Sequence, residues 1–195
     1  MRTLLLVICL LFTACDSVEV EVVDETMMVD DEGNYIPPCL VPWQLRIDDS
    51  VLDPDYGFDP ILVENMSNWW NERGEEEWFI YTDACEDEEL PCIDVSSGFT
   101  GTPLYDETEA YGVFFYEIEN GCVTTGSIFV SSDIAYDEET VQWVLYHEGG
   151  HALSLLDDPY SLDLNSIMSI RYLPYSDVTA QDLFVLHENL IVFER

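Results

Sequence analysis

The segment His147-Glu148-Gly149-Gly150-His151 holds the residue types in this chain that are best suited to catalysis. Residues four apart on a helix lie one above the other on the same face, so the imidazoles of His147 and His151 can share one zinc ion. The carboxylate of Glu148 can take a proton from water and deliver it to a leaving amine without binding the metal. The spacing therefore predicts a zinc-dependent hydrolase with Glu148 as general base.

A catalytic zinc ion takes three protein ligands and keeps a fourth position for water, whose pKa falls to about 7. We expect Asp157 to be the third ligand, because a chain that turns just after Leu155 brings this carboxylate back to the metal. Asp158 is the nearest alternative. His187 is another, as the only remaining histidine, although a histidine on a terminal helix is more often a surface or core residue.

A longer motif, His147-Glu148-x-x-His151-x-x-Ser154-x-x-Asp157, is followed by Ser166-Ile167-Met168-Ser169. This combination resembles the metzincin clan of zinc endopeptidases, in the snapalysin-like branch where the third ligand is an aspartate. The resemblance implies one Zn²⁺ ion held by three ligands, His147, His151 and Asp157. It also implies that Glu148 is the catalytic base and that Met168 packs beneath the metal in a methionine turn without binding it.

The resemblance further implies an α+β fold over residues 36–195. We expect a twisted, mostly parallel sheet with an antiparallel edge strand, an N-terminal helix, an active-site helix and a C-terminal helix. A peptide substrate would lie along the edge strand, for which we expect Gly126–Val130, and Ile170–Tyr175 would form the pocket wall beyond the scissile bond. Ser154 replaces the clan's glycine, where left-handed backbone costs on the order of 1 kcal/mol. Tyr172 is the counterpart of the clan's tyrosine after the methionine.

Hydrophobic periodicity and turn residues divide the chain into elements. Asp59-Pro60 predicts the start of a helix to about Glu72, and Asn120-Gly121 predicts a hairpin turn. Asp137 is the expected cap of a helix from about Glu138 to Leu155, which carries both motif histidines. The remaining expected elements are strands at Trp43–Ile47, Trp78–Thr82, Tyr111–Ile118 and Cys122–Val130, and a last helix at Ala180–Leu190.

The first residues predict a processing segment rather than part of the fold. Arg2 precedes the apolar run Leu4–Phe12, which is too short to span a bilayer, and Phe12-Thr13-Ala14-Cys15 resembles a bacterial lipobox. We therefore expect a lipoprotein-type signal peptide at 1–14 and a flexible acidic tether at 15–35. The exported protein, expected to be a monomer, would be anchored to a bacterial membrane through lipid on Cys15. Ordinary secretory cleavage is the alternative.

Four cysteines remain beyond the signal segment, and an even number in an exported chain suggests two disulfides. Cys85 and Cys92 flank a short acidic loop, which favours the pairs Cys85–Cys92 and Cys39–Cys122. Cys39 could instead cap the zinc ion as a thiolate, although we prefer the disulfide.

The charge balance limits the class of partner. The chain has 41 Asp and Glu residues against 5 Lys and Arg residues, a net charge of -36. Such a surface repels nucleic acid and anionic lipid, so the membrane is reached only through the lipid anchor. A peptide or protein substrate is the expected partner. Clusters such as Asp53-Pro54-Asp55 and Asp133 offer carboxylates for structural Ca²⁺, but solvated loops are favoured because no EF-hand spacing occurs.

Two other functions fit parts of the sequence. A zinc-binding but catalytically weak lipoprotein on the same scaffold, acting as a binding module, would explain two departures from the clan's pattern, Ser154 in place of glycine and Ile170 in place of tyrosine. An acidic interaction protein would use its charge to bind cationic peptides, and such binding would collapse with added salt.

Overall fold

The computed structural model describes residues 41–87, 90–98, 111–119, 122–155, 166–168, 177–180 and 182–183 of the 195-residue chain. These residues form a mostly parallel five-stranded sheet with an antiparallel edge strand, together with two α-helices of 14 and 15 residues. The expected α+β class is confirmed at this level. The elements are β1 (Trp43–Ile47), η1 (Asp49–Leu52), α2 (Ile61–Gly74), β2 (Phe79–Tyr81), β3 (Cys92–Gly98), β4 (Gly112–Glu119), β5 (Cys122–Ser131), η2 (Ser132–Ile134) and α3 (Glu138–Ala152).

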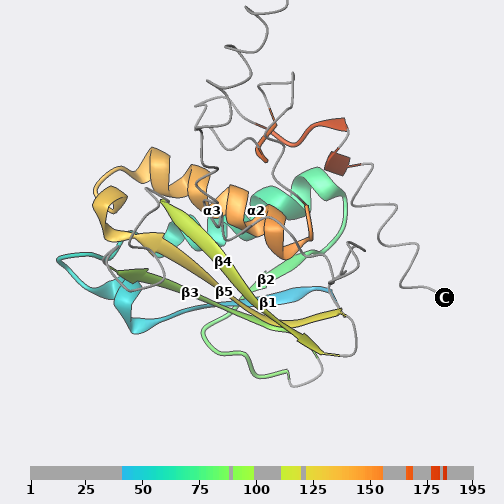
Figure 1. Cartoon of the computed structure of the whole chain (residues 1–195), viewed down its shortest axis with the longest axis horizontal. Coiled ribbons are helices and arrows are strands. Elements are labelled where there is room, and N and C mark those ends of the chain that lie inside the picture. The colour runs from blue at the N-terminus through green and yellow to red at the C-terminus, as the bar shows by residue number, and fades with distance from the viewer. Residues whose placement is uncertain are drawn as a thin grey trace, which may run out of the picture.

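The strand order in the sheet is β2-β1-β3-β5-β4. Strands β2, β1, β3 and β5 run parallel, and β4 returns antiparallel along β5. Both helices lie on the same side of the sheet (Figure 1), with α2 against β1 and β2 and α3 against β4 and β5. The end of α3 therefore lies beside the edge of the sheet that β4 forms.

The strand order corrects the expectation that Gly126–Val130 forms the free edge. This segment belongs to β5, which pairs with β3 on one side and with β4 on the other. Its backbone hydrogen bonds are thus already made within the sheet. Among the strands that the structure describes, β4 pairs only with β5 and is the edge strand next to α3.

Most element boundaries fall close to the expected ones. The first strand is as predicted, and the register pairs Glu119 with Cys122 across the predicted hairpin turn. Helix α2 ends at Gly74 rather than Glu72. Helix α3 ends at Ala152 rather than Leu155, because the chain turns sharply at Ser154. Strand β3, in the middle of the sheet, was not predicted at all.

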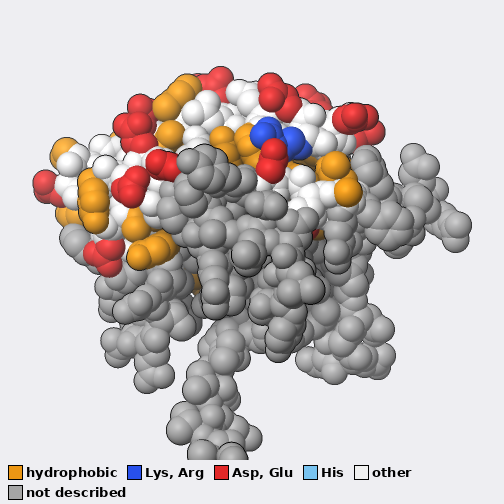
Figure 2. Space-filling view, turned by 90° about the horizontal axis from the view of Figure 1, so that it is seen from above, with side chains coloured by type: hydrophobic (Ala, Val, Ile, Leu, Met, Phe, Trp, Pro, Cys, Tyr) orange, Lys and Arg blue, Asp and Glu red, His pale blue; other side chains and the backbone are white. Residues whose placement is uncertain are grey.

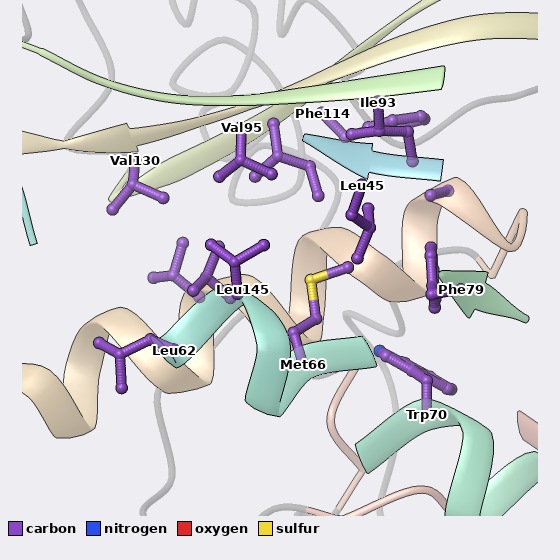
Figure 3. Close-up of a cluster of buried hydrophobic side chains, with 14 of the residues drawn as sticks. Leu45, Leu62, Met66, Trp70, Phe79, Ile93, Val95, Phe114, Val130 and Leu145 are labelled. Atoms are coloured by element: carbon purple, nitrogen blue, oxygen red, sulfur yellow. The ribbon is translucent and has the colours of Figure 1, made fainter. Parts of the chain in front are cut away.

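The core lies between the sheet and the two helices. Along β3, the side chains alternate, so that Ile93 and Val95 are fully buried while Asp94 is half-buried on the other face. Figure 3 shows Met66 of α2 pointing toward the sheet, where Leu45 lies. Complete burial of such a side chain contributes about 1.5–3 kcal/mol, and this packing holds α2 against the sheet.

The predicted disulfide between Cys85 and Cys92 is present, with their Cα atoms 5.9 Å apart. The turn that it closes is also held by Gln44 of β1, whose side-chain amide donates to the carbonyls of Asp87 at 2.8 Å and Leu90 at 3.2 Å. Cys39 and the side chain of Cys122 lie outside the described residues.

Candidate metal centre

Helix α3 positions both motif histidines. Its predicted cap is confirmed, since the Asp137 carboxylate accepts hydrogen bonds from the N–H of Thr140 at 3.3 Å and its hydroxyl at 2.8 Å. Val144 and Leu145 are buried against the core, which fixes the rotation of the helix about its axis. The next residues, from His147 onward, are buried as well, although most of them are not hydrophobic.

The two imidazoles lie on consecutive turns and are nearly enclosed. His147 is 7% exposed and His151 is 8% exposed, and their ring centroids are 4.8 Å apart at an angle of 89°. Nδ1 of His147 lies 2.8 Å from the carbonyl oxygen of Ile167, and Nδ1 of His151 lies 2.9 Å from that of Leu155. A carbonyl only accepts, so the shared hydrogen is on Nδ1 in both rings and the lone pair of the neutral ring is on Nε2. This is the form in which histidine binds a metal through Nε2 while a carbonyl orients the ring.

Two glycines let other side chains approach this part of the helix. A Cβ at Gly149 would stand 2.8 Å from Nε1 of Trp70 and 2.9 Å from Cε of Met66. A Cβ at Gly150 would stand only 2.3 Å from Sδ of Met168. The absence of side chains at these two positions therefore lets α2 and the Met168 segment pack directly against the backbone between the histidines.

The segment Ser166–Met168 is held from the other side by residues of the C-terminal region. The N–H of Ile167 donates to the carbonyl of Asp177 at 2.9 Å, next to a parallel bridge between Ser166 and Asp177. The Ser166 hydroxyl donates to the Asp182 carboxylate at 3.1 Å and accepts from the N–H of Met168 at 3.0 Å. Met168 is fully buried, so this turn forms a fixed floor under α3.

Asp182 was missed in the sequence, although a signal for it was present. Its carboxylate accepts from the N–H of Thr179 at 2.8 Å, while the Thr179 hydroxyl accepts from the N–H of Asp182 at 3.2 Å. This reciprocal pair is a capping box, and the spacing Thr-x-x-Asp indicates one from sequence. The expected helix start near Thr179 agrees with the described residues there.

Helix α3 ends in a turn that brings the chain back onto its last residues. Ser154 has a φ of 64°, the left-handed conformation anticipated for the position where the metzincin pattern has glycine. The N–H of Leu155 then donates to the carbonyl of Gly150 at 2.9 Å, and the carbonyl of Leu155 accepts from His151. The turn expected just after Leu155 therefore begins at Ser154, and it orients one histidine directly.

The side chain of Glu148 extends from α3 toward the edge strand β4. It is 6% exposed, and its Oε1 stands 3.1 Å from the position that a Cβ at Gly112 would occupy. Gly112 is the first residue of β4, so the carboxylate lies against the beginning of the edge strand of the described sheet. Any side chain at Gly112 would also meet Cγ1 of Val144 at 2.2 Å, and only glycine leaves room for this approach.

Several predicted site residues lie outside the described residues: Asp157, Asp158, Tyr172, His187, Cys15 and the range 170–175. Within the part of the chain that the structure describes, no group of three or more His, Cys, Asp or Glu side chains is placed to hold a metal ion. This includes the acidic clusters around Asp53 and Asp133. The described site thus contains two histidines and one adjacent carboxylate.

These residues fit a zinc ion by their chemistry. Zinc prefers imidazole nitrogen, and catalytic zinc sites commonly take two histidines and one further ligand. His147 and His151 are buried, carry the lone pair on Nε2 in this tautomer, and have carbonyl partners that fix their rings.

No protein-family model matches this chain, and no curated protein matches it in sequence. In the described part of the chain, no helix is both long and apolar enough to cross a membrane. The functional assignment therefore depends on the motif and on the geometry around α3.

Proposed function

We propose that this protein is an exported, zinc-dependent endopeptidase of the metzincin type. The observation that carries the proposal is the pair of buried imidazoles on consecutive turns of α3, each with Nδ1 bonded to a backbone carbonyl. A buried carboxylate, Glu148, lies directly beside them. Burying three such polar side chains in one stretch of helix lowers the free energy of unfolding. A metal-binding role would explain why the protein keeps this unfavourable burial.

In this proposal His147, His151 and Asp157 hold one Zn²⁺ ion, with Met168 packed below the helix. The bound zinc supplies Lewis acidity, which makes water a nucleophile at neutral pH. The chain's own contribution is to orient the ligands and to exclude bulk solvent. The carbonyls of Ile167 and Leu155 orient the two histidines, and the burial of both rings helps to exclude bulk solvent.

Glu148 is the proposed proton carrier. Its carboxylate takes one proton from the attacking water as the oxygen adds to the substrate carbonyl carbon. It then gives this proton to the amide nitrogen as the C–N bond breaks, so that the products are a carboxylic acid and an amine. Burial beside Gly112 leaves the carboxylate little freedom to leave this position.

The substrate in this proposal is an extended peptide that adds to the outer edge of β4, which pairs only with β5 among the described strands. An exposed sheet edge offers unpaired N–H and C=O groups along its length, and a peptide can pair with them as an additional strand. The position of Glu148 at the start of β4 would bring a bound peptide bond within reach of the carboxylate. The proposed location is the bacterial cell envelope, through lipid on Cys15.

The competing proposal, a zinc-binding module with little turnover, was based on Ser154 in place of glycine and on Ile170 in place of the clan's tyrosine; Ile170 lies outside the described residues. Ser154 adopts left-handed backbone in spite of its side chain, so the helix end reaches the geometry that glycine would give. The structural reason to favour weak turnover is therefore reduced.

The test compares wild-type protein with Glu148→Ala and Glu148→Gln, measuring zinc content and cleavage of casein. We expect about one zinc per chain in all three, and a fall in cleavage of at least about 100-fold in both variants. Glu139→Gln, an exposed carboxylate on the first turn of the same helix, is the matched control and should cleave normally. Equal activity in wild type and Glu148→Gln would refute the role of Glu148. Stoichiometric zinc without any cleavage across a diverse peptide library would support the binding module instead.

A further inference from the structure

We propose that Arg73 is a positioning residue for the metal centre, acting on His147 through a closed ring of contacts that includes Asp177. The inference depends on the proposed zinc site for its functional meaning, although the contacts themselves do not involve the metal. Arg73 lies on α2, and neither it nor Asp177 belongs to the motif that suggested the site.

The first half of the ring joins Arg73 to α3 through stacked aromatic side chains. The guanidinium carbon of Arg73 lies 4.1 Å from the ring centroid of Trp69. Trp69 in turn stacks on Tyr146 with ring centroids 4.2 Å apart and an angle of 10° between the planes. Tyr146 directly precedes His147, so the stack fixes the backbone at the first ligand. Trp70 adds to this link by donating its Nε1 hydrogen to the Tyr146 carbonyl at 3.0 Å.

The second half of the ring joins Arg73 to the imidazole itself. Arg73 makes a forked ion pair with Asp177, in which Nε contacts Oδ1 and Nη2 lies 3.4 Å from Oδ2. The carbonyl of Asp177 accepts from the N–H of Ile167 at 2.9 Å, and the carbonyl of Ile167 accepts from Nδ1 of His147 at 2.8 Å. The two ends of the ring are therefore consecutive residues of α3.

This arrangement locks the direction of the Ile167 carbonyl. Arg73 is held on one side by the Trp69 ring and on the other by both carboxylate oxygens of Asp177, so it behaves as a rigid spacer between α2 and the Ser166–Met168 turn. The carbonyl fixes the proton on Nδ1 of His147 and so presents Nε2 to the metal. Loss of the spacer should let the carbonyl move, which would release the tautomer and lower metal affinity without removing a ligand.

The chain offers a matched control on the other face of the sheet. Arg46 of β1 pairs with Asp94 of β3 at 2.6 Å, and their side chains are 42% and 44% exposed. This pair has the same chemistry as Arg73–Asp177 and a comparable exposure, 31% and 58% for the latter. Arg46→Gln therefore removes one Arg–Asp pair without touching the ring.

The experiment measures zinc affinity by competition with a chelating indicator, using Arg73→Gln, Asp177→Asn, the double variant, Arg73→Lys and Arg46→Gln. Partners of metal-bound histidines typically change affinity by 10–100-fold, and we expect about tenfold for Arg73→Gln because it acts through Asp177 and Ile167. The double variant should lose no more than the single one. Arg73→Lys keeps the charge but not the fork, and should lose about threefold. Arg46→Gln should stay within about twofold of wild type.

A second readout separates positioning from general stability and does not need the metal. In metal-free protein, the ¹⁵N shifts of the imidazole nitrogens report which nitrogen of His147 carries the proton, and the chain has only 3 histidines to assign. We expect mostly the Nδ1–H form in wild type and in Arg46→Gln, and a mixture of both tautomers in Arg73→Gln.

The proposal would be overturned if Arg73→Gln kept the wild-type tautomer and the wild-type zinc affinity. It would also be overturned if Arg46→Gln lost as much zinc affinity as Arg73→Gln. If wild type binds no zinc, the proposed function fails, while the tautomer comparison still decides whether Arg73 positions His147. Asp177→Asn gives the same test if Arg73→Gln does not fold.

Discussion

Helices α2 and α3 lie side by side on one face of the sheet, yet they bury different kinds of residue. Helix α2 buries an apolar stripe at helical spacing, which consists of Leu62, Val63, Met66 and Trp70. Helix α3 begins in the same way with Val141, Val144 and Leu145, and then buries two histidines, a glutamate and two glycines. Both helices pack on the same face of the sheet, so their position does not explain the difference. We attribute it to their different roles, stability for α2 and the proposed chemistry for α3.

The comparison separates stability from chemistry within a single layer. An apolar side chain gains free energy on burial, whereas a buried histidine or glutamate loses hydration and regains it only through specific hydrogen bonds. For the two histidines of α3, these bonds are made with the carbonyls of Ile167 and Leu155, which lie outside the helix. On the face seen in Figure 2, the described surface carries many acidic side chains and little basic surface. The buried polar stretch of α3 is therefore the region to which we assign the proposed function.

The largest expected effect is on the stability of metal-free protein. Met66 is completely buried in α2, and Met66→Ala should lower the free energy of unfolding by about 2–5 kcal/mol. Glu148→Gln keeps the size and shape of the buried side chain and leaves no cavity, so it should lower this free energy by less than Met66→Ala does. Urea unfolding of both variants measures the difference. A greater loss for Glu148→Gln than for Met66→Ala would show that the buried carboxylate is a structural residue.

The second effect is the stabilisation that zinc itself provides. A ligand present at 100 times its dissociation constant raises the free energy of unfolding by about 2.7 kcal/mol, provided that it binds only the folded state. If the proposed zinc site is correct, this gain should appear in wild type and in Met66→Ala, and should be lost in His147→Ala and in His151→Ala. Thermal unfolding with zinc and with a chelator, at fixed protein concentration, tests all four proteins. Retained zinc stabilisation in both His147→Ala and His151→Ala would place the metal elsewhere.

A smaller effect should appear at the helix ends. Both helices are followed by non-glycine residues in left-handed backbone, Glu75 after α2 with φ 57° and Ser154 after α3 with φ 64°. Glu75 is exposed, and Glu75→Gly should raise the free energy of unfolding by about 0.5–1 kcal/mol. Ser154 is fully buried, so Ser154→Gly relieves the same strain but also removes packed atoms. Its increase in the free energy of unfolding should therefore be smaller than that of Glu75→Gly. Urea unfolding compares the two, and equal gains would show that the Ser154 side chain contributes nothing at the site.

The sequence predicted those parts of the fold that local patterns determine. The cap at Asp137 and the start of α3, strand β1 and the hairpin before β5 all depend on residues close together in the chain. Strand β3 was missed because its seven residues include only two branched apolar ones, Ile93 and Val95, next to serine, aspartate and glycine. Its conformation comes from pairing with β1 and β5 on both sides, which is a tertiary effect.

The same limit applies to the site. The placement of the two histidines followed from motif spacing, because a helix converts spacing into geometry. The left-handed turn at Ser154 was expected only from the resemblance to the metzincin pattern. The identity of the edge strand could not be predicted in this way. Strands β4 and β5 have similar alternating patterns, and only their order in the sheet distinguishes them. The pair Arg73–Asp177 joins residues 104 positions apart, and no local pattern indicates such a contact.

The smallest expected effect concerns Tyr146, which joins the two helices through its stack on Trp69. Burial raises the pKa of the Tyr146 phenol above its ordinary value of 10, opposed by the charge of Arg73 and assisted by that of Glu72. The folded state therefore keeps the proton more tightly than the unfolded state. The resulting stability is complete below pH 10 and is lost as the pH rises through the raised pKa.

Tyr146→Phe keeps the stack but cannot ionise, so its free energy of unfolding should fall less steeply than that of wild type between about pH 9 and about pH 11. Some slope should remain, because burial also raises the pKa values of Tyr81 and Tyr116. Urea unfolding at several pH values across this range measures the slope, and Tyr111→Phe, at an exposed tyrosine, is the control. An unchanged slope in Tyr146→Phe would mean that this phenol is as solvated in the folded protein as in the unfolded chain. The contact between α2 and the residue before His147 would then be looser than the stacked rings indicate, and the coupling between the two helices at the metal centre would be weaker in proportion.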